Sequence, residues 1–328
     1  MSAKVLPTFA DVDLAADRIR GVAVRTPLIN APVLDERLRA RVFLKAETLQ
    51  RTGSFKFRGA YNKISSIAPE RRAGGVVAYS SGNHAQGVAA SAKLNGMRAT
   101  IVMPADAPLA KRQRTQALGA EVVLYDRDRE DRAAIAHKIA DERGATLVPP
   151  FDDPLIIAGQ GTIGREIVED LSTLGLKPDL VLVGCSGGGL IAGTALGVKA
   201  RVPDAVFYAV EPAGFDDTLR SFASGNRERN ARMSGSICDA LLTDRPGEIT
   251  FPINRALVGQ GLTVTDEEVA RAVRYAFEEL KLVVEPGGAV GLAAMLAGKV
   301  ELAGKIVAGV LSGGNVDAEM FGKLIMAS

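Results

Sequence analysis

Short β-branched runs alternate with longer helical patterns along most of this chain, and this alternation restricts its fold more than any other feature. Strands are expected at residues 75–79, 99–103, 121–125 and 146–148, and helices at residues 84–94, 107–118 and 132–143. Strands joined by crossover helices form parallel sheets that are covered on both faces. Residues 74–150 therefore predict a small doubly wound α/β unit.

The rest of the chain predicts a second unit of the same class. Strands are expected at residues 42–46, 179–183, 206–210 and 306–311, and helices at residues 58–68, 161–171, 190–200 and 266–279, with a further helix that ends at residue 296. Residues 214–254 are the least regular part, and there we expect a short strand or two and surface loops. The sequence thus predicts an α/β protein with two doubly wound open sheets.

Charge and cysteine content restrict the class of protein. Forty basic and 38 acidic residues leave a formal net charge of +2, and no basic or aromatic-basic stripe indicates a nucleic-acid surface. No apolar run approaches the length of a membrane span, and the first 13 residues do not resemble a signal peptide, so we expect a cytoplasmic protein. Cys185 and Cys238 fit that compartment and are expected to be small buried residues.

A chemically interesting lysine follows a glycine-containing loop. Lys56 lies between Phe55 and Phe57, where the loop leads into a helical run. Partial desolvation weakens the preference of a lysine for its charged form and makes the amine a nucleophile or a base. Taken alone, however, a lysine in the first turn of a helix is more often a solvated surface residue. This run by itself leaves both interpretations open.

A run of three glycines is the second chemical feature. Gly187, Gly188 and Gly189 lie between a predicted buried strand and a predicted helix, where free N–H groups favour a phosphate, and the Ser186 hydroxyl could add a hydrogen bond. A nicotinamide site is a rival, because Glu211 lies 22 residues after Gly189 at the end of the next strand. A simple tight turn is the third possibility, since single glycine motifs are weak signals.

One cofactor accounts for both features, because pyridoxal phosphate carries a phosphate for the glycine loop and an aldehyde that forms an imine with Lys56. Five motifs then match a known family in order: SFKFRGA at residues 54–60, SSGNHAQG at 80–87, AGQGT at 158–162, GGGL at 187–190 and SGGN at 312–315. The chain resembles the fold-type II pyridoxal-phosphate enzymes, which have a tryptophan synthase β-like fold. Within them it is similar to the threonine and serine dehydratase and serine racemase family.

The resemblance implies the architecture and the cofactor site. We expect a large domain from residues 1–73 and 151–328, a small domain from residues 74–150, and the cofactor in the cleft between them. Lys56 would be the Schiff-base lysine and the base for the substrate α-proton, and Ser312 would face the pyridine nitrogen. The residues implied in cofactor binding are Phe55, Lys56, Asn83, Ser186, Gly187, Gly188, Gly189, Leu190, Glu285 and Ser312.

The substrate side of the site is implied by the serine loop and one arginine. Ser80, Ser81, Gly82 and His84 would hold the amino-acid carboxylate at a helix N-terminus. Ser81 would also lie opposite Lys56, where serine racemases use a second base, whereas a packed structural role is the rival for His84. Arg132 matches an arginine that contacts the distal carboxylate of dicarboxylate substrates in relatives, although its charged run also fits a solvated helix start.

A cation site is implied after the strand at residues 206–210. Relatives bind Mg²⁺ or Ca²⁺ with a Glu, an Asp six residues later and a carbonyl between them, which here are Glu211, Asp217 and the Phe215 carbonyl. The rival interpretation is that Asp216 or Asp217 caps a helix that begins at Thr218.

The expected activity is that of a threonine/serine ammonia-lyase, which converts a β-hydroxy L-amino acid to a 2-oxo acid and ammonia. An amino-acid racemase and a threo-3-hydroxyaspartate ammonia-lyase are alternatives within the family, and a nicotinamide-dependent or ligand-binding protein is an alternative outside it. The family also implies a homo-oligomer, either a dimer or a tetramer. Because the sequence stops at Ser328, we expect no regulatory domain of the kind found in feedback-controlled dehydratases.

Overall fold

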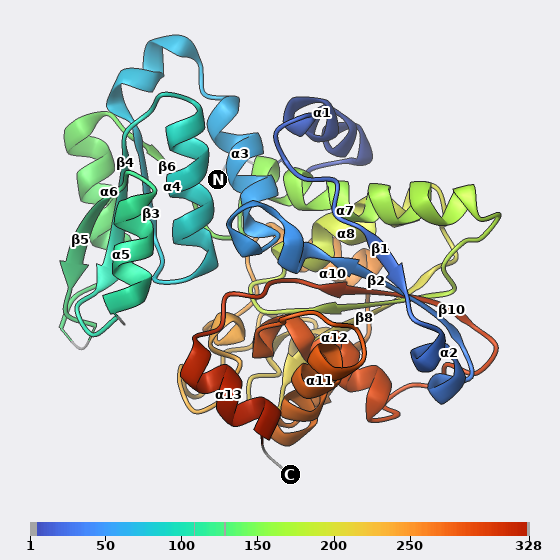
Figure 1. The fold of residues 1–328 in the computed structure, drawn as a ribbon. Coiled ribbons are helices and arrows are strands. Elements are labelled where there is room, and N and C mark those ends of the chain that lie inside the picture. The colour runs from blue at the N-terminus through green and yellow to red at the C-terminus, as the bar shows by residue number, and fades with distance from the viewer. Residues whose placement is uncertain (1–4, 108, 128, 327–328) are drawn as a thin grey trace.

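The computed structural model describes residues 5–107, 109–127 and 129–326, and it contains two open β-sheets in two lobes (Figure 1). The larger sheet has the strand order β1-β2-β10-β7-β8-β9, and the smaller has the order β5-β4-β3-β6. Every strand pair is parallel except β1 with β2. The predicted α/β class with two doubly wound sheets is confirmed.

The larger sheet is built from both ends of the chain. Its strands are β1 (Leu28–Asn30), β2 (Arg41–Ala46), β7 (Leu180–Gly184), β8 (Val206–Pro212), β9 (Gly261–Val264) and β10 (Ile306–Leu311). Within β7, Leu180 and Leu182 pack into one core and Val181 and Val183 into the other. Strand β7 is a continuous apolar run because helices cover both of its faces.

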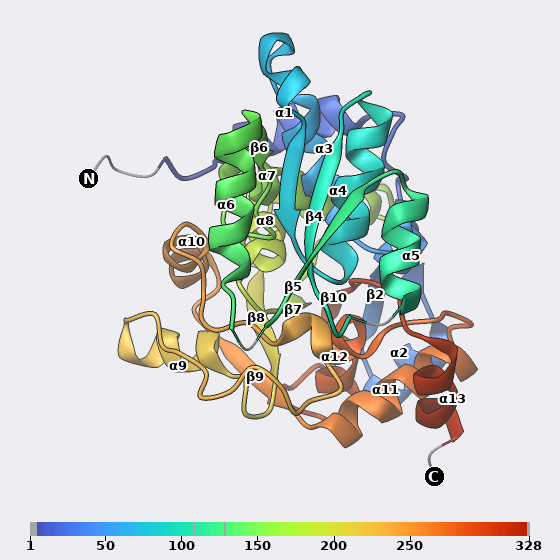
Figure 2. The same ribbon diagram turned by 90° about the vertical axis from the view of Figure 1, so that its left-hand side faces the viewer.

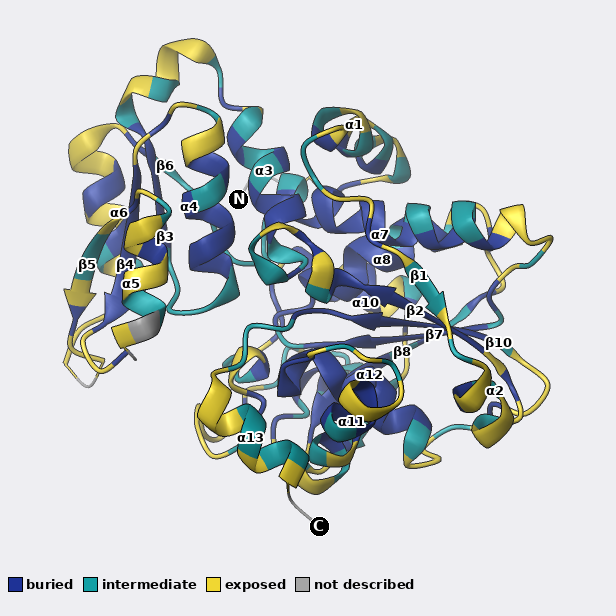
Figure 3. Cartoon of the chain, in the orientation of Figure 1, coloured by how far each residue is buried: buried dark blue, intermediate teal, exposed yellow. Residues whose placement is uncertain are grey.

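The helices divide between the two faces of this sheet, as Figure 1 shows. One face carries α7 (Pro154–Thr173) and α8 (Gly189–Lys199), with α10 (Thr250–Leu257) against α8, and the other carries α2 (Pro32–Leu38), α11 (Asp266–Glu278) and α12 (Pro286–Leu296). At the periphery, α1 (Phe9–Ile19) packs on α7, α9 (Asp217–Ser224) on β8 and α13 (Ala318–Met326) on α11. Figure 3 shows the central strands and α12 as buried.

The smaller sheet has helices on both faces. It contains β3 (Val76–Tyr79), β4 (Ala99–Pro104), β5 (Glu121–Tyr125) and β6 (Thr146–Leu147). Helix α4 (Asn83–Leu94) covers one face, α6 (Arg132–Arg143) covers the other, and α5 (Leu109–Ala117) lies against β5 and α4. Figure 2 shows the strands between α6 on one side and α4 and α5 on the other.

Helix α3 (Lys56–Ser65) connects the two lobes. Its residues Ala60 and Ile64 are fully buried in the core of the smaller sheet, although the predicted boundary at residue 73 assigns them to the large domain. The same helix packs on α7, whose Ile163 and Ile167 belong to the core of the larger sheet. The assignment of residues to two domains stays a prediction.

Several elements differ from the sequence-based prediction. Residues 214–254 contain helix α9 and the start of α10 but no strand, so the strands expected there were wrong. Helices α1, α2 and α13 and strands β1 and β9 were not predicted from the sequence. Within the described part of the chain, no helix is both long enough and apolar enough to cross a membrane.

Candidate active site

A cavity of about 500 Å³ lies between the two sheets, where the carboxyl ends of β2, β3, β7 and β10 meet. Ligands of open α/β sheets bind at such ends. All the residues predicted to bind cofactor or substrate line this one cavity: Phe55, Lys56, Ser80, Ser81, Gly82, Asn83, His84, Arg132, Ser186, Gly187, Gly188, Gly189, Leu190, Glu285 and Ser312. The structure thus brings these residues together, and their individual roles stay predictions.

Lys56 is the first residue of α3. Its Nζ donates a hydrogen bond to the Pro150 carbonyl oxygen at 2.7 Å and lies 5.1 Å from the centre of the Phe55 ring. Burial lowers the pKa of Lys56 to about 8, although the negative charge of Glu285 acts in the opposite direction. An amine with this pKa is partly neutral near pH 8 and can act as a nucleophile or a base.

The glycine loop exposes backbone donors to the cavity. The Gly187 carbonyl accepts a hydrogen bond from Thr250 Oγ1 at 2.5 Å, and the Gly188 carbonyl accepts one from Asn254 Nδ2 at 3.1 Å. Across a trans peptide the next N–H points the opposite way, so the N–H groups of Gly188 and Gly189 point away from α10. Gly189 also begins α8, whose first N–H groups have no intrahelical acceptor. This arrangement suits a phosphate.

The glycines themselves are required by the protein around the loop. A Cβ at Gly187 would lie 2.4 Å from the Phe151 ring, and one at Gly188 would lie 2.5 Å from Asn254 Nδ2. Gly188 also has a φ of +90°, which disfavours any residue with a side chain. The loop is therefore held closely between Phe151 and α10.

Helix α10 is a functional element that the sequence analysis missed. Asp152 Oδ1 accepts hydrogen bonds from the N–H groups of Ile249 and Thr250, at 2.7 and 3.2 Å, and so fixes the start of this helix. Thr250 and Asn254 are thereby placed on the glycine loop. The DDP sequence at residues 152–154 is a helix-start signal for α7, but it contains no indication that Asp152 holds a helix almost 100 residues away.

The turn after β3 leads into α4 and supplies further donors. The Ser80 N–H donates to the Val102 carbonyl and the Gly82 N–H to Ser80 Oγ, so these two donors are already used. Among the described residues, the N–H groups of Ser81, Asn83 and His84 have no protein acceptor. The predicted carboxylate site at this helix N-terminus therefore has fewer free N–H donors than the sequence indicated.

The His84 side chain is buried and has a hydrogen-bond partner. It is 3% exposed, and its Nε2 lies 2.8 Å from the Val148 carbonyl oxygen, which fixes Nε2 as the donor. Burial and the positive charge of Lys56 lower the pKa of His84 to about 3. The side chain is thus neutral at physiological pH, which favours the packed role over proton transfer.

A hydrogen-bonded chain fixes the wall of the cavity near Ser312. Asn83 Nδ2 donates to Glu285 Oε1 at 2.5 Å, and Asn315 Nδ2 donates to Asn83 Oδ1 at 2.7 Å. Burial raises the pKa of Glu285 to about 7, and the charge of Asp239 adds to this effect. Ser312 follows β10, and its carbonyl accepts the Phe55 N–H at 3.0 Å. These bonds join the segments that carry Lys56, Asn83 and Ser312.

The lobe of the smaller sheet contributes three cationic side chains to the cavity. Arg132 begins α6 and lies over the Tyr79 ring, with its guanidinium carbon 5.6 Å from the ring centre. Lys111 and Arg114 of α5 line the same cavity, and the sequence analysis did not select them. Arg132 is exposed, but it belongs to the cavity wall rather than to a remote solvated face.

The predicted cation ligands lie outside this cavity, between the end of β8 and the start of α9. Glu211, Phe215 and Asp217 are all at most 1% exposed. Burial raises the pKa of Glu211 to about 8, with a further contribution from the charge of Asp217, and burial raises the pKa of Asp217 to about 7. Asp217 Oδ2 is buried without a hydrogen-bond partner among the described residues. An unpaired buried carboxylate oxygen fits a hard cation.

The helix cap at this place is neither of the two aspartates considered from sequence. Asp216 occupies the N-cap position of α9 but makes no capping hydrogen bond. Glu211 accepts the N–H groups of Thr218 and Leu219 at 2.9 Å each, so this strand residue caps the helix. Asp216 therefore occupies the predicted N-cap position, but the capping acceptor is Glu211 rather than either aspartate.

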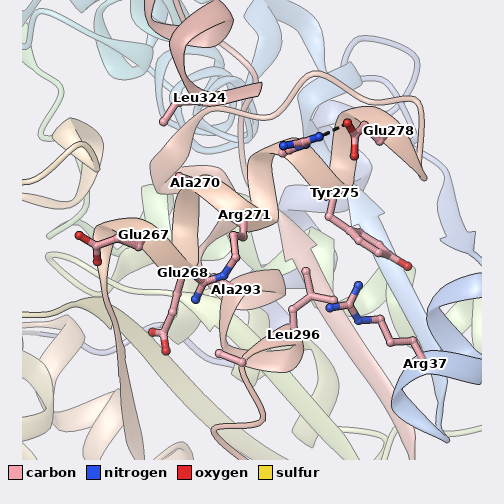
Figure 4. Close-up of a pocket in the computed structure, with 12 residues that line it drawn as sticks. Arg37, Glu267, Glu268, Ala270, Arg271, Tyr275, Glu278, Ala293, Leu296 and Leu324 are labelled. Carbon is pink, nitrogen blue, oxygen red and sulfur yellow. Dashed lines mark hydrogen bonds and ion pairs between the residues drawn. The ribbon is translucent and has the colours of Figure 1, made fainter. Parts of the chain in front are cut away.

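A second groove, of about 510 Å³, lies on the opposite side of the larger sheet from α8, the helix that follows the glycine loop. Helices α11 and α12 form most of it, and Figure 4 shows Tyr275 of α11 beside Arg37 of α2, whose guanidinium carbon lies 5.4 Å from the ring centre. None of the residues predicted to be functional lines it. The candidate active site is the cavity that contains Lys56.

Comparison with known proteins places this cavity in a family. The family described as "Pyridoxal-phosphate dependent enzyme" matches residues 19–313, which include Lys56, the glycine loop and Ser312. The chain belongs to this family. A pyridoxal-phosphate cofactor would account for both Lys56 and the glycine loop, so the basis for the nicotinamide alternative is removed.

Individual relatives resemble the chain over almost its whole length. It is 45% identical to an L-threo-3-hydroxyaspartate ammonia-lyase of Pseudomonas over 98% of this chain and 99% of that protein. It is 42% identical to an L-threonine ammonia-lyase of Thermotoga maritima, over 97% of this chain and 78% of that protein. The structure of maize serine racemase superimposes with a TM-score of 0.91 at 34% identity, covering 97% of each chain.

These comparisons confirm the group that the sequence motifs indicated. The chain is a fold-type II pyridoxal-phosphate enzyme of the threonine dehydratase, serine racemase and hydroxyaspartate ammonia-lyase group. The order of the expected substrates needs correction, because the similarity supports the hydroxyaspartate alternative better than the threonine/serine activity that the sequence analysis put first.

Proposed function

We propose that this protein is a pyridoxal-phosphate-dependent ammonia-lyase that acts on L-threo-3-hydroxyaspartate. The observation that carries the proposal is the position of Arg132, which lines the same cavity as Lys56 and has its guanidinium over the ring of Tyr79, another lining residue. A guanidinium there offers a planar pair of donors to a second carboxylate. The similarity to the Pseudomonas hydroxyaspartate ammonia-lyase supports the same substrate.

The residues of the cavity fit the cofactor. The unused N–H groups of the glycine loop would hold its phosphate, Lys56 would bind its aldehyde, and Ser312 would accompany its ring. When bound, pyridoxal phosphate withdraws electrons from the α-carbon of an amino acid and so makes the α-proton acidic.

Backbone and side-chain groups of the protein would bind the substrate and move its protons. The free N–H groups of Ser81, Asn83 and His84 at the start of α4 receive the α-carboxylate, and Arg132 receives the distal carboxylate. The substrate amine would replace Lys56 at the aldehyde, and the freed Lys56 amine, with a pKa of about 8, would then remove the α-proton. Loss of the β-hydroxyl as water and hydrolysis of the resulting enamine yield a dicarboxylic 2-oxo acid and ammonia, with no net change in oxidation state.

Racemisation is the second candidate activity. Ser81 lines the same cavity as Lys56, and a hydroxyl and an amine in one cavity could serve the two faces of an α-carbon. The similarity to maize serine racemase supports this candidate. Chiral analysis of residual L-serine separates the two activities, because a racemase accumulates D-serine whereas a lyase accumulates 2-oxo acid.

We also propose a structural Mg²⁺ or Ca²⁺ ion between the end of β8 and the start of α9. Glu211, the Phe215 carbonyl and Asp217 would supply hard oxygen ligands, and the unpartnered Asp217 Oδ2 supports this assignment. The ion would neutralise two carboxylates that burial otherwise drives toward their protonated forms.

The deciding experiment measures 2-oxo acid release by purified holoenzyme from L-threo-3-hydroxyaspartate, L-threonine and L-serine. We expect the highest kcat/KM with hydroxyaspartate. Arg132→Met should lower that kcat/KM about 10- to 100-fold, the cost of one lost charge-assisted hydrogen-bonded contact, and should affect L-serine much less.

Arg129→Met is the matched control, because Arg129 belongs to the same charged run, is 85% exposed and does not line the cavity. It should behave as the wild type does. A higher kcat/KM with L-threonine, together with an unchanged substrate ratio in Arg132→Met, would overturn the proposal and restore the threonine/serine activity.

A further inference from the structure

An ion pair between the two lobes forms part of the cavity wall. Lys111 Nζ of α5 lies 2.8 Å from Asp239 Oδ2 of a short 3₁₀-helix, Asp239–Leu241, on the side of the larger sheet. Both residues line the cavity that contains Lys56. The pair therefore joins elements that are 128 residues apart in the sequence, directly at the site.

The charges around this pair are unevenly distributed. The lobe of the smaller sheet contributes Lys111, Arg114 and Arg132, whereas Asp239, Glu285 and Asp317 are the acidic residues that line the cavity from the larger lobe. Asp239 is close enough to Glu285 to raise the pKa of its carboxyl. A ligand with a second carboxylate meets both a cationic wall and the opposing charge of Asp239.

We propose that the Lys111–Asp239 pair tunes the preference of this site between amino acids with one and with two carboxylates. Asp239 repels a distal carboxylate, and Lys111 cancels most of that repulsion while it holds the Asp239 side chain. The inference rests on the proposed lyase function and adds to it two residues that determine specificity through charge. Neither residue takes part in proton transfer.

The size of the effect follows from exposure. The Lys111 side chain is 30% exposed and the Asp239 side chain 64%, so water screens the pair. We therefore expect changes of about three- to fivefold in the substrate ratio, the range of an exposed charge pair. The changes should shrink in about 1 M salt, where the screening length falls to about 3 Å.

The test compares the ratio of kcat/KM for L-threo-3-hydroxyaspartate to that for L-serine in holoenzyme variants. Lys111→Met leaves Asp239 uncompensated, so the ratio should fall about three- to fivefold. Asp239→Asn removes the repulsion and leaves Lys111 free, so the ratio should rise by a similar factor. The double variant should return toward the wild-type ratio, which damage to the fold would not produce.

Lys138→Met is the matched control, because it removes one lysine from the same lobe at a position that is 76% exposed and outside the cavity. Its ratio should equal that of the wild type. A fall of the ratio in Asp239→Asn, a change in the same direction in both single variants, or changes that keep their full size in about 1 M salt would overturn the inference.

A second readout separates this inference from the proposed function. Binding of L-aspartate and L-alanine, which lack the β-hydroxyl, is followed through the visible spectrum of the holoenzyme. If hydroxyaspartate is not turned over but the aspartate-to-alanine affinity ratio changes as described, the proposed function fails and the inference stands. If hydroxyaspartate is turned over and both variants leave the affinity ratio unchanged, the inference fails and the function stands.

Discussion

The amine of Lys56 donates a 2.7 Å hydrogen bond to the carbonyl oxygen of Pro150. Lys56 begins α3, and Pro150 precedes α7. This bond therefore joins the starts of two helices that pack on each other. The amine is enclosed but has a neutral acceptor rather than a carboxylate as its direct partner. Burial therefore dominates, and it lowers the pKa of this lysine to about 8.

The first prediction concerns the pH dependence of cofactor incorporation. Only the neutral amine attacks an aldehyde, so in cofactor-free protein the rate of appearance of the visible band should rise about tenfold per pH unit below pH 8 and level off above it. A lysine with the ordinary value of 10.5 would continue to gain rate up to that pH. Stopped-flow absorbance between pH 6 and 10 measures the bend.

Glu285→Gln is a control for this profile, because it should shift the bend in a known direction. The negative charge of Glu285 raises the pKa of Lys56, so its removal should move the bend to lower pH. A wild-type rate that is still rising at pH 10 would contradict the burial argument. A bend that moves to higher pH in the variant would also contradict it.

The second prediction concerns acid stability. His84 has a folded-state pKa of about 3 and an ordinary value of 6.5, so the unfolded chain binds the additional proton between these values. Stability is fully present above pH 6.5 and is lost as the pH falls toward 3. His84→Gln keeps a donor for the Val148 carbonyl but does not titrate, so from pH 7 to pH 4 it should lose about 3 kcal/mol less than the wild type does.

Urea unfolding of the holoenzyme at pH 7, 5.5 and 4 gives the three free energies of unfolding. His137→Gln controls for the substitution itself, because His137 is exposed on α6. Parallel pH profiles for the wild type and His84→Gln would show that the buried imidazole does not contribute to acid sensitivity.

The third prediction concerns a buried charge network behind Lys56. Arg58 is 0% exposed and donates to both carboxylate oxygens of Glu47 at 2.8 Å and to Glu166 at 2.7 and 2.9 Å. Arg58→Met would leave Glu47 buried without its cation, which typically costs about 3–5 kcal/mol. The urea unfolding free energy should fall by that amount.

Arg143→Met tests whether the cost arises from burial. Arg143 also pairs with a carboxylate, that of Glu121, but the two side chains are 41% and 51% exposed. Its loss should cost less than about 1 kcal/mol. Equal losses in the two variants would mean that burial does not determine the cost of losing the cation.

The sequence predicted those parts of the site that a short run of neighbouring residues is enough to identify. Lys56 and the glycine run are recognisable because the residue types and their neighbours carry the signal, and both line the cavity as expected. Strand β10 and helix α6 were also predicted with the observed bounds, because β10 is an uninterrupted apolar run and α6 lies between the capping residues Asp131 and Gly144. Local patterns are the part of a fold that a single sequence expresses most directly.

The parts that were missed depend on contacts between distant residues. Thr250 holds the glycine loop from a segment of mixed polarity, in which the sequence analysis expected strands and loops. Lys111 and Asp239 are ordinary charged residues in the sequence and become a pair only because the two lobes meet. Glu211 caps α9 from the preceding strand, a geometry that helix-start signals do not contain.

The last prediction concerns the proposed cation. An ion that binds Glu211, the Phe215 carbonyl and Asp217 in the folded protein stabilises it by mass action, by about 2.7 kcal/mol at 100 times its dissociation constant. For a protein of this size that corresponds to an increase in Tm of about 5 °C. Removal of divalent ions should therefore lower the Tm of the holoenzyme, and Mg²⁺ or Ca²⁺ should restore it.

Asp217→Asn removes one ligand charge and should abolish the response of the Tm to added ions. Asp216→Asn is the matched control, because Asp216 is the neighbouring residue and pairs with Arg220 at 3.1 Å instead. It should retain the response. Because the readout is a melting temperature, the result is independent of which substrate the enzyme prefers. A wild-type Tm that ignores both chelator and ions would leave Asp217 Oδ2 as a buried carboxylate oxygen without a partner, and the raised pKa of this group would then indicate a protonated Asp217.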